Sequence, residues 1–246
     1  MISSNDLLVF LAILAFGTIK YSTIMGSAYY VFWMLKPSWL SMFKKIQVQE
    51  RAKPQVKLEM KYSAYTLVIQ ALCFFFIYKL NEQGIVHIVP EQPLWKDLVA
   101  LLIYVMIYDP FFYFLHKIMH QNRWLYRNVH VVHHRSLNPT PWATYSFHPI
   151  EAFANMLYFF PFFFLTSVSV PMLAVILILT DMANLAGHLG YEVFSEKVQD
   201  SWWGRWITTP THHNIHHQVS SSNFGLYFNG WDLWFKTLNA KDKRKK

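Results

Sequence analysis

The sequence has few charged residues and almost no cysteine. Charged side chains make up 15% of its 246 residues, well below the roughly 25% of a typical soluble domain. Hydrophobic residues make up 54% and aromatic residues 18%, and the mean hydropathy is +0.18. This composition is typical of a membrane protein. The one cysteine, Cys73, excludes an internal disulfide and indicates a buried structural thiol.

Acidic residues are scarce as well, which leaves a formal net charge of +8. The basic residues cluster beside apolar segments, so the positive-inside rule explains them better than a nucleic-acid partner does. The first residues, MISSND, lack the basic region and cleavage site of a signal peptide. No internal repeat or flexible linker occurs. We expect one structural domain whose first apolar run stays in the membrane.

Four apolar runs approach or exceed the length of about 20 residues that a membrane span needs. They are residues 7–35, 64–80, 94–115 and 153–186. Lys20 lies near the middle of the first run, where a lysine is tolerated if the helix tilts and the side chain reaches the interface or faces other helices. The runs predict an all-α, integral-membrane helical bundle.

Charge bias between the runs predicts the orientation of the bundle. Lysines and arginines crowd the loop after the first run, whereas residues 81–93 contain neither and carry Glu82 and Glu91. The positive-inside rule places the first loop in the cytosol, so the third run returns there at His116. The basic residues of the first loop are Lys36, Lys44, Lys45, Arg51, Lys53, Lys57 and Lys61.

The fourth run is too long for one straight span. At 1.5 Å per residue it would extend about 50 Å, against a hydrocarbon core of about 30 Å. Pro161 and Pro171, with the polar residues between them, predict a break near the middle. A two-helix hairpin returns the chain to the side it left, so that all the histidines discussed next can lie on one side of the membrane.

Nine of the twelve histidines fall in two short patches, residues 116–134 and 212–217. Their steps of three and four residues place imidazoles on one face of a helix, as a metal site needs. Eight imidazoles are too many for one ion with about four ligands, so two metal ions are expected. The eight candidate ligands, also the candidate catalytic residues, are His116, His120, His130, His133, His134, His213, His216 and His217.

Several neighbouring residues are candidates for smaller roles. His188 ends the returning helix and is expected to be a ligand; Asn184, four residues earlier, is a weaker candidate on the same face. Asp109 shares the face of His116, and it either supports a ligand imidazole or simply lies near a helix end before Pro110. Three other histidines are expected outside the metal site: His212 as an outer or surface residue, His148 at the start of a helix, and His87 in the outer loop.

The identity of the metal does not follow from imidazole alone, which suits iron, copper, zinc and nickel. The setting narrows the choice. Aromatic residues 111–114 adjoin the first histidines at the mouth of a membrane bundle, where lipid substrates are expected. Lipids present mainly unactivated C–H bonds, whose oxidation requires O₂ and a redox metal, so iron fits best.

With these motifs, the sequence resembles the fatty acid hydroxylase/sterol desaturase superfamily of membrane diiron oxidases. The resemblance rests on D-P-F-F-Y-F-L-H-K-I-M-H, H-V-V-H-H, G-H-L-G-Y-E and H-H-N-I-H-H, which lie between residues 109 and 217. Two further stretches, N-P-T-P-W-A-T-Y-S-F-H-P-I-E-A-F and N-F-G-L-Y-F-N-G-W-D-L-W-F, are similar to the sterol C-5 desaturase branch. We therefore expect N-terminal membrane helices and a basic cytosolic loop in residues 1–108, a catalytic region in 109–238 and a basic tail in 239–246.

The resemblance implies two irons held by the eight histidines and His188, with O₂ as co-substrate and removal of hydrogen from a lipid methylene. Desaturation and hydroxylation both remain open. The chain has no G-x-G-x-x-G loop, no C-x-x-C-H haem attachment and no His-Pro-Gly-Gly segment of a fused cytochrome b5 domain. Electrons are therefore expected from a separate carrier, a cytochrome b5 or a ferredoxin, attracted by the positive cytosolic face.

Three alternative functions remain open on the sequence. The first is a hydroxylase of fatty acyl, sphingoid or ether lipids. The second, of another class, is a histidine-lined zinc transporter, although transport sites lie near the bilayer midplane and these histidines lie at helix ends. The third is a catalytically inactive family member. The leading hypothesis is a sterol oxidase in the endoplasmic reticulum of a eukaryote, or in the plasma membrane of a bacterium.

Overall fold

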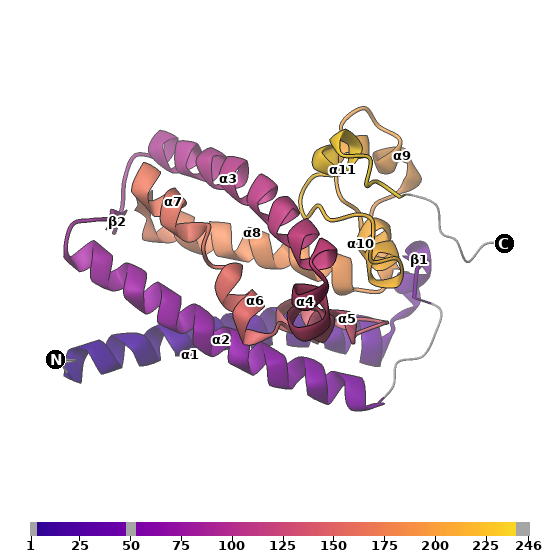
Figure 1. Ribbon diagram of the computed structural model, residues 1–246, viewed down its shortest axis with the longest axis horizontal. Helices are drawn as coiled ribbons and strands as arrows, with labels where there is room; N and C mark the ends of the chain where they lie inside the picture. The colour runs from indigo at the N-terminus through magenta and orange to yellow at the C-terminus, as the bar shows by residue number, and fades with distance from the viewer. Residues whose placement is uncertain (1–3, 48–52, 240–246) are drawn as a thin grey trace.

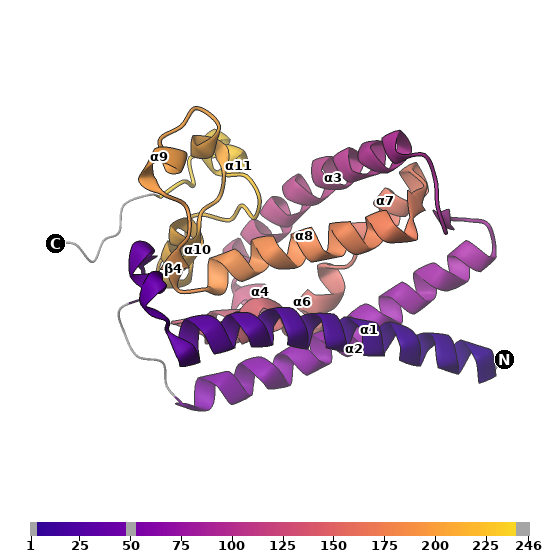
Figure 2. The same cartoon turned by 180° about the vertical axis from the view of Figure 1, so that it is seen from behind.

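Four long helices form the body of the molecule. The computed structural model describes residues 4–47 and 53–239. The long helices are α1 (Ser4–Tyr29), α2 (Lys53–Glu82), α3 (Leu94–Gln121) and α8 (Val170–His188), and they run along the longest axis of the molecule (Figures 1 and 2). Each lies within a segment that is long and apolar enough to cross a membrane. The predicted all-α membrane bundle is therefore confirmed.

The lipid-facing surface is visible as apolar stripes on these helices. On α3, the side chains of Leu94, Leu98, Leu102 and Met106 recur every four residues, and each is more than half exposed. Such a continuous apolar stripe is unfavourable in water and suits a hydrocarbon environment. The cysteine is buried and unpaired, as predicted.

The long run at residues 153–186 is interrupted where the sequence indicates a break. Two short helices, α6 (Pro149–Ala154) and α7 (Phe159–Leu165), lead away from the histidine end, and α8 leads back (Figure 1). The outward part is thus not one continuous helix. Between α7 and α8, strand β3 (Val168–Ser169) pairs in parallel with β2 (Ile88–Val89). The Ser169 side chain caps α8 and donates to Asp97 of α3 over 2.6 Å, which fixes the turn.

The remaining elements form a cap over one end of the long helices (Figure 1). Strand β1 (Lys44–Lys45) pairs antiparallel with β4 (Tyr191–Glu192), joining the segment after α1 to the segment after α8. The cap helices are α4 (Arg123–Leu125), α5 (Val131–His134), α9 (Glu196–Gln199), α10 (Pro210–Gln218) and α11 (Gly230–Trp234). A π-helical segment, Tyr126–His130, joins α4 to α5.

Lys20 faces other parts of the bundle, one of the arrangements expected from the sequence. Its ammonium forms an ion pair with Asp181 of α8 and a 3.2 Å hydrogen bond with the hydroxyl of Tyr145. The side chains of Lys20 and Asp181 are 11% and 3% exposed, respectively. The charge is thus neutralised inside the bundle rather than presented to lipid.

Candidate metal centre

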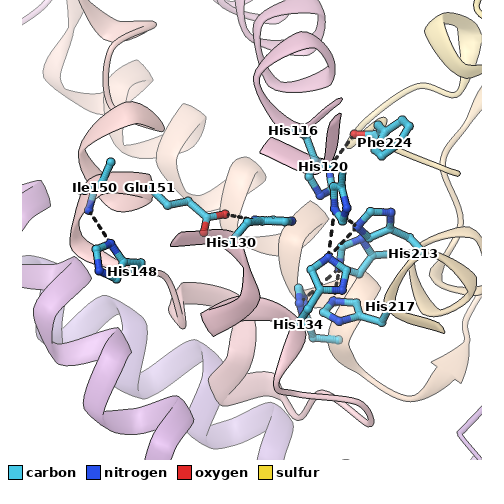
Figure 3. Close-up of polar contacts among 12 residues, drawn as sticks. His116, His120, His130, His134, His148, Ile150, Glu151, His213, His217 and Phe224 are labelled. Atoms are coloured by element: carbon cyan, nitrogen blue, oxygen red, sulfur yellow. Dashed lines mark hydrogen bonds and ion pairs between the residues drawn. The ribbon is translucent and has the colours of Figure 1, made fainter. Parts of the chain in front are cut away.

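Nine histidines gather at the cap end of the bundle in two groups. Within each group the potential ligand atoms lie within 4.8 Å of one another. The five-histidine group contains His116, His120, His130, His134 and His216, and the four-histidine group contains His133, His188, His213 and His217. Figure 3 shows several of these rings converging from α3, α5 and α10. All nine candidate histidines are therefore brought together on one side of the molecule.

Helical spacing explains how the histidines are sorted. Residues four apart lie within about 40° of each other around a helix, whereas adjacent residues such as His133 and His134 are about 100° apart. The pairs His116–His120, His130–His134 and His213–His217 each stay in one group. The remaining members of the two H-x-x-H-H boxes, His133 and His216, enter the opposite group. Each of the two H-x-x-H-H boxes thus contributes ligands to both groups.

The five-histidine group contains a close triangle of nitrogen atoms. The Nε2 atoms of His120, His134 and His216 lie 3.0 to 3.1 Å apart. Ligands on one ion with bonds of about 2 Å have comparable separations. The Nε2 atoms of His116 and His130 are buried and have no hydrogen-bond partner among the described residues. An ion bound here would satisfy atoms that are otherwise costly to bury.

The four-histidine group has the same character. The Nε2 atom of His213 lies 3.3 Å from Nε2 of His188 and 3.1 Å from Nε2 of His217. Nδ1 of His133 is buried and unpaired within the described part of the chain. Both groups offer only imidazole nitrogen, so the donor set fits a transition metal and disfavours calcium or magnesium.

Oxygen atoms behind the rings hold the imidazoles in place. Nδ1 of His130 donates to the carboxylate of Glu151 over 2.7 Å (Figure 3). In the same way, Nδ1 of His116, His188 and His216 donates to the backbone carbonyls of Phe224, Asn184 and Ser222 over 3.0, 2.7 and 2.7 Å. A donor at Nδ1 leaves the Nε2 lone pair directed at the group, which is the usual support of metal-ligating histidines.

Electrostatics keep these imidazoles in the form that binds metal. For the six histidines outside the long helices, burial lowers the pKa well below its usual value, and neighbouring imidazoles lower it further. Metal ligation requires the neutral ring, so these groups are ready to bind at physiological pH. The six are His130, His133, His134, His213, His216 and His217.

Comparison with known sequences agrees with this arrangement. The sequence model described as Fatty acid hydroxylase matches residues 101–237, more than half of the chain and all nine histidines. The chain belongs to the fatty acid hydroxylase family. The predicted superfamily is thereby confirmed, and the relatives described next support its sterol desaturase branch.

Curated relatives of this family member include sterol enzymes of fungi and animals. A Delta(7)-sterol 5(6)-desaturase of Gibberella zeae is 25% identical over 191 residues, covering 76% of this chain and 57% of the relative. Human lathosterol oxidase is 26% identical over 185 residues, covering 73% and 60%. A very-long-chain aldehyde decarbonylase of rice (Oryza sativa subsp. japonica) is 24% identical, covering 67% and 64%.

This family member therefore spans only about 57–64% of the length of those three relatives. No solved structure matches the chain.

Two residues have roles that differ from the sequence predictions. Asp109 does not contact an imidazole. Instead, it accepts hydrogen bonds from the backbone of Tyr227 and Phe228 and from Nε1 of Trp231, and so holds the cap to α3. Of the two roles considered for Asp109, support of a ligand imidazole is therefore not observed, and Glu151 supports an imidazole instead. Glu151 lies 21 residues from His130, so no helical spacing could have linked them.

The structure agrees with the predictions for His148 and His212 and does not test the one for Asn184. His148 caps α6 by accepting from the Ile150 N–H over 3.2 Å, as expected of a helix start (Figure 3). His212 lies outside both groups and forms a capping box with Thr209 at the start of α10. The Asn184 side-chain amide donates to the Thr180 carbonyl. Its role as a ligand stays a prediction.

Glycine at position 187 permits the close approach of α8 and α10. A Cβ atom there would lie 2.7 Å from Cδ2 and 2.9 Å from Cγ of the His213 ring. Such distances are far shorter than ordinary contacts, so only glycine lets His213 reach His188. This local requirement explains the glycine in the G-H-L-G-Y-E motif.

An apolar cavity adjoins the histidines. It has a volume of about 650 Å³ and lies between α1, α2, α3 and α8, within the size range of small-molecule sites. A much smaller space of about 20 Å³ separates it from the rings of both groups. Phe112, Phe147, Asn155 and Asn184 line both spaces. The two spaces therefore adjoin, and rings of both histidine groups border the smaller one.

Proposed function

We propose that the chain is a membrane-bound, O₂-dependent diiron oxidoreductase that desaturates or hydroxylates a C–H bond of a sterol or related lipid. The observation that carries the proposal is that two all-histidine groups border a small space whose lining residues Phe112, Phe147, Asn155 and Asn184 also line the apolar cavity. Relatives named as a sterol desaturase and lathosterol oxidase favour a sterol over other lipids. A hydroxylase of fatty acyl, sphingoid or ether lipids is the second candidate, because the cavity is apolar along most of its length.

The nine histidines would hold two irons, one in each group. When bound, iron supplies the redox chemistry that lets O₂ attack an unactivated C–H bond. The protein's part is to orient the imidazoles through Glu151 and the backbone carbonyls, and to hold the lipid in the cavity. The space beside the histidines, which Phe112 and Phe147 line, would hold only a small part of the substrate, and this would limit which carbon can react.

Electrons would come from a separate carrier of the cytochrome b5 or ferredoxin type. Arg123, Arg127 and Arg135 are exposed on the cap beside the histidine boxes. A positive surface there attracts an acidic carrier and raises its rate of encounter. By the positive-inside rule this end of the bundle faces the cytosol, in the endoplasmic reticulum of a eukaryote or at the plasma membrane of a bacterium.

A zinc transporter is the less favoured reading. Transport sites lie near the bilayer midplane between spanning helices. Here both histidine groups lie at one end of the long helices and within the cap (Figure 1). The apolar cavity, rather than a polar path, continues from the histidines into the bundle.

The test is lipid mass spectrometry of cells with and without the gene, combined with iron analysis of the purified protein. We expect about two irons per chain and a sterol that has lost two hydrogens or gained one oxygen. His133→Ala and His216→Ala, one from each group, should abolish the change while the protein still inserts into membranes. An unchanged lipid profile together with altered zinc uptake would overturn the proposal in favour of the transporter.

A further inference from the structure

The cavity lining contains one charged cluster whose chemistry the proposed reaction leaves unexplained. Among the described residues that line the cavity, Lys20 and Asp181 are the only charged ones. Tyr145 joins them: its hydroxyl donates to Asp181 over 2.6 Å and accepts from Lys20 over 3.2 Å. Burying a charged pair in a membrane bundle is costly, so such a pair is a candidate functional site.

The cluster has one hydrogen-bond donor to spare. A lysine ammonium carries three N–H groups. One is used by Asp181 and one by Tyr145, and no other acceptor for Lys20 occurs among residues 4–47 and 53–239. Lys20 also lines the cavity, so the remaining N–H is available to a bound molecule. A ligand oxygen would complete the set.

The charge of the cluster indicates what kind of oxygen it accepts. Lys20 and Asp181 neutralise each other, and no further cation among the described residues lines the cavity. A phosphate, sulfate or carboxylate would therefore bring an uncompensated charge into an apolar space, at high desolvation cost. A neutral hydroxyl or aldehyde oxygen meets the free N–H without that cost.

The position of the cluster divides the cavity unequally. Asp181 precedes His188 by seven residues on α8, a rise of about 10 Å, and follows Val170 by eleven residues, about 16 Å. Val170, Ile88 and Pro90 line the far end of the cavity. Toward the histidines the cavity reaches only as far as Phe112, Phe147, Asn155 and Asn184, beyond which lies the space of about 20 Å³, room for about one water molecule. Most of the cavity lining is on the other side, so the long apolar part of a ligand fits best on the side away from the histidines.

We propose that Lys20, held by Asp181 and Tyr145, binds the neutral oxygen at the polar end of the lipid substrate. The apolar remainder then lies toward Val170, and the carbon presented to the histidines is a few bonds from that oxygen, not far along a tail. This proposal rests on the proposed oxidase function and names its substrate class: neutral lipids with a hydroxyl or aldehyde near the carbon that reacts.

The test compares the binding of matched lipids to the full-length protein in nanodiscs, without reductant. One pair of probes is lathosterol and its 3-deoxy analogue; the second is octadecanal and octadecane. Lathosterol sulfate serves as the charged probe. A hydrogen bond to a charged group gives an affinity difference of roughly ten-fold or more. We expect the wild type to prefer the oxygen-bearing member of at least one pair by that factor, and to bind the sulfate more weakly than lathosterol.

The decisive variant is Lys20→Met/Asp181→Asn, which removes both charges together and leaves no unpaired carboxylate. In this variant the ratio of the affinities for the oxygen-bearing and oxygen-free lipids should fall to about one, while the affinity for the oxygen-free lipid stays unchanged. The matched control is Lys79→Met/Asp6→Asn, which removes a second lysine–aspartate pair, 2.9 Å apart and away from the cavity lining. The control should keep the wild-type preference.

Two results would overturn the proposal: a wild type that prefers the oxygen-bearing member of neither pair, or a Lys20 variant that weakens both members equally. If the double variant does not fold, Lys20→Gln/Asp181→Asn replaces it, because two amides can hydrogen-bond each other without a buried charge and the shorter side chain at position 20 should not reach the ligand. Iron content is measured on the same preparations, and product is measured on a second portion of each after a reductant and O₂ are added. Binding with the expected preference but no oxidation would refute the oxidase function alone, and oxidation without preference would refute this proposal alone.

Discussion

The two histidine groups are built differently, although they offer the same ligand atoms. The five-histidine group depends on contacts between distant segments: its rings are held by Glu151 and by the carbonyls of Ser222 and Phe224. The four-histidine group is more compact. His188 is held by a carbonyl of its own helix, and His213 packs directly on Gly187. The five-histidine group thus relies on hydrogen bonds from the rings to oxygen atoms behind them, and it has one imidazole more than a tetrahedral site needs. The four-histidine group relies on close packing and has no extra imidazole.

Removal of one histidine ligand should give the largest difference between the two groups. In the four-histidine group, His217→Ala leaves three imidazoles, so we expect about one iron per chain to be lost and activity to fall by more than about a hundred-fold. In the five-histidine group, His120→Ala leaves four imidazoles, a complete tetrahedral set. It should retain about two irons with weaker binding, although product formation should be lost as in His216→Ala. Elemental analysis and product formation measure both effects, and equal iron loss in the two variants would contradict the distinction.

Removal of the hydrogen bond between Glu151 and His130 should lower the metal affinity of the five-histidine group only. Glu151→Ala leaves Nδ1–H of His130 without its partner, and losses of support of this kind cost about 10–100-fold in metal affinity. The experiment is an iron titration in the His217→Ala background, where the five-histidine group holds the remaining ion. Asp109→Asn is the control, because Asp109 bonds the cap and touches no histidine. Identical titration curves for Glu151→Ala and its parent would exclude the supporting role.

A packing change should affect the four-histidine group by the smallest amount. Gly187→Ala places a methyl group 2.7 Å from the His213 ring, and overpacking of this kind costs about 1–3 kcal/mol. We expect a lower unfolding temperature and weaker binding of one iron. Gly17→Ala is the matched control, since its added Cβ would meet only Leu67 at 3.8 Å. A Gly187→Ala protein as stable as this control would show that α8 and α10 can separate without loss.

The sequence was sufficient to predict the bundle and the convergence of nine histidines. Apolar run length and charge bias identify the long helices, and helical spacing identifies the boxes. Spacing could also have predicted the sorting of His133 and His216 into opposite groups, because each is rotated from its box partners. The role of Glu151 could not be predicted, since its contact with His130 depends on how the loop between them folds back.

The partner of Lys20 illustrates the same limit. The sequence shows a lysine within an apolar run but not its distance from Asp181, which lies 161 residues later. The observed contacts of Asp109 could not be predicted for a related reason. It shares a helix face with His116, yet the chain after α10 returns and supplies three N–H donors that occupy its carboxylate. Periodicity describes one helix, whereas these contacts depend on tertiary packing.

The contact of Phe224 with His116 has a consequence for biosynthesis. The carbonyls of Ser222 and Phe224 follow the last histidine in the chain, yet they hold rings of the five-histidine group. During translation every long helix therefore leaves the ribosome and enters the bilayer before that group can be completed. The nascent chain must remain in the membrane with an open, metal-free end until residues 222–224 emerge, so iron loading is expected to follow insertion of the long helices.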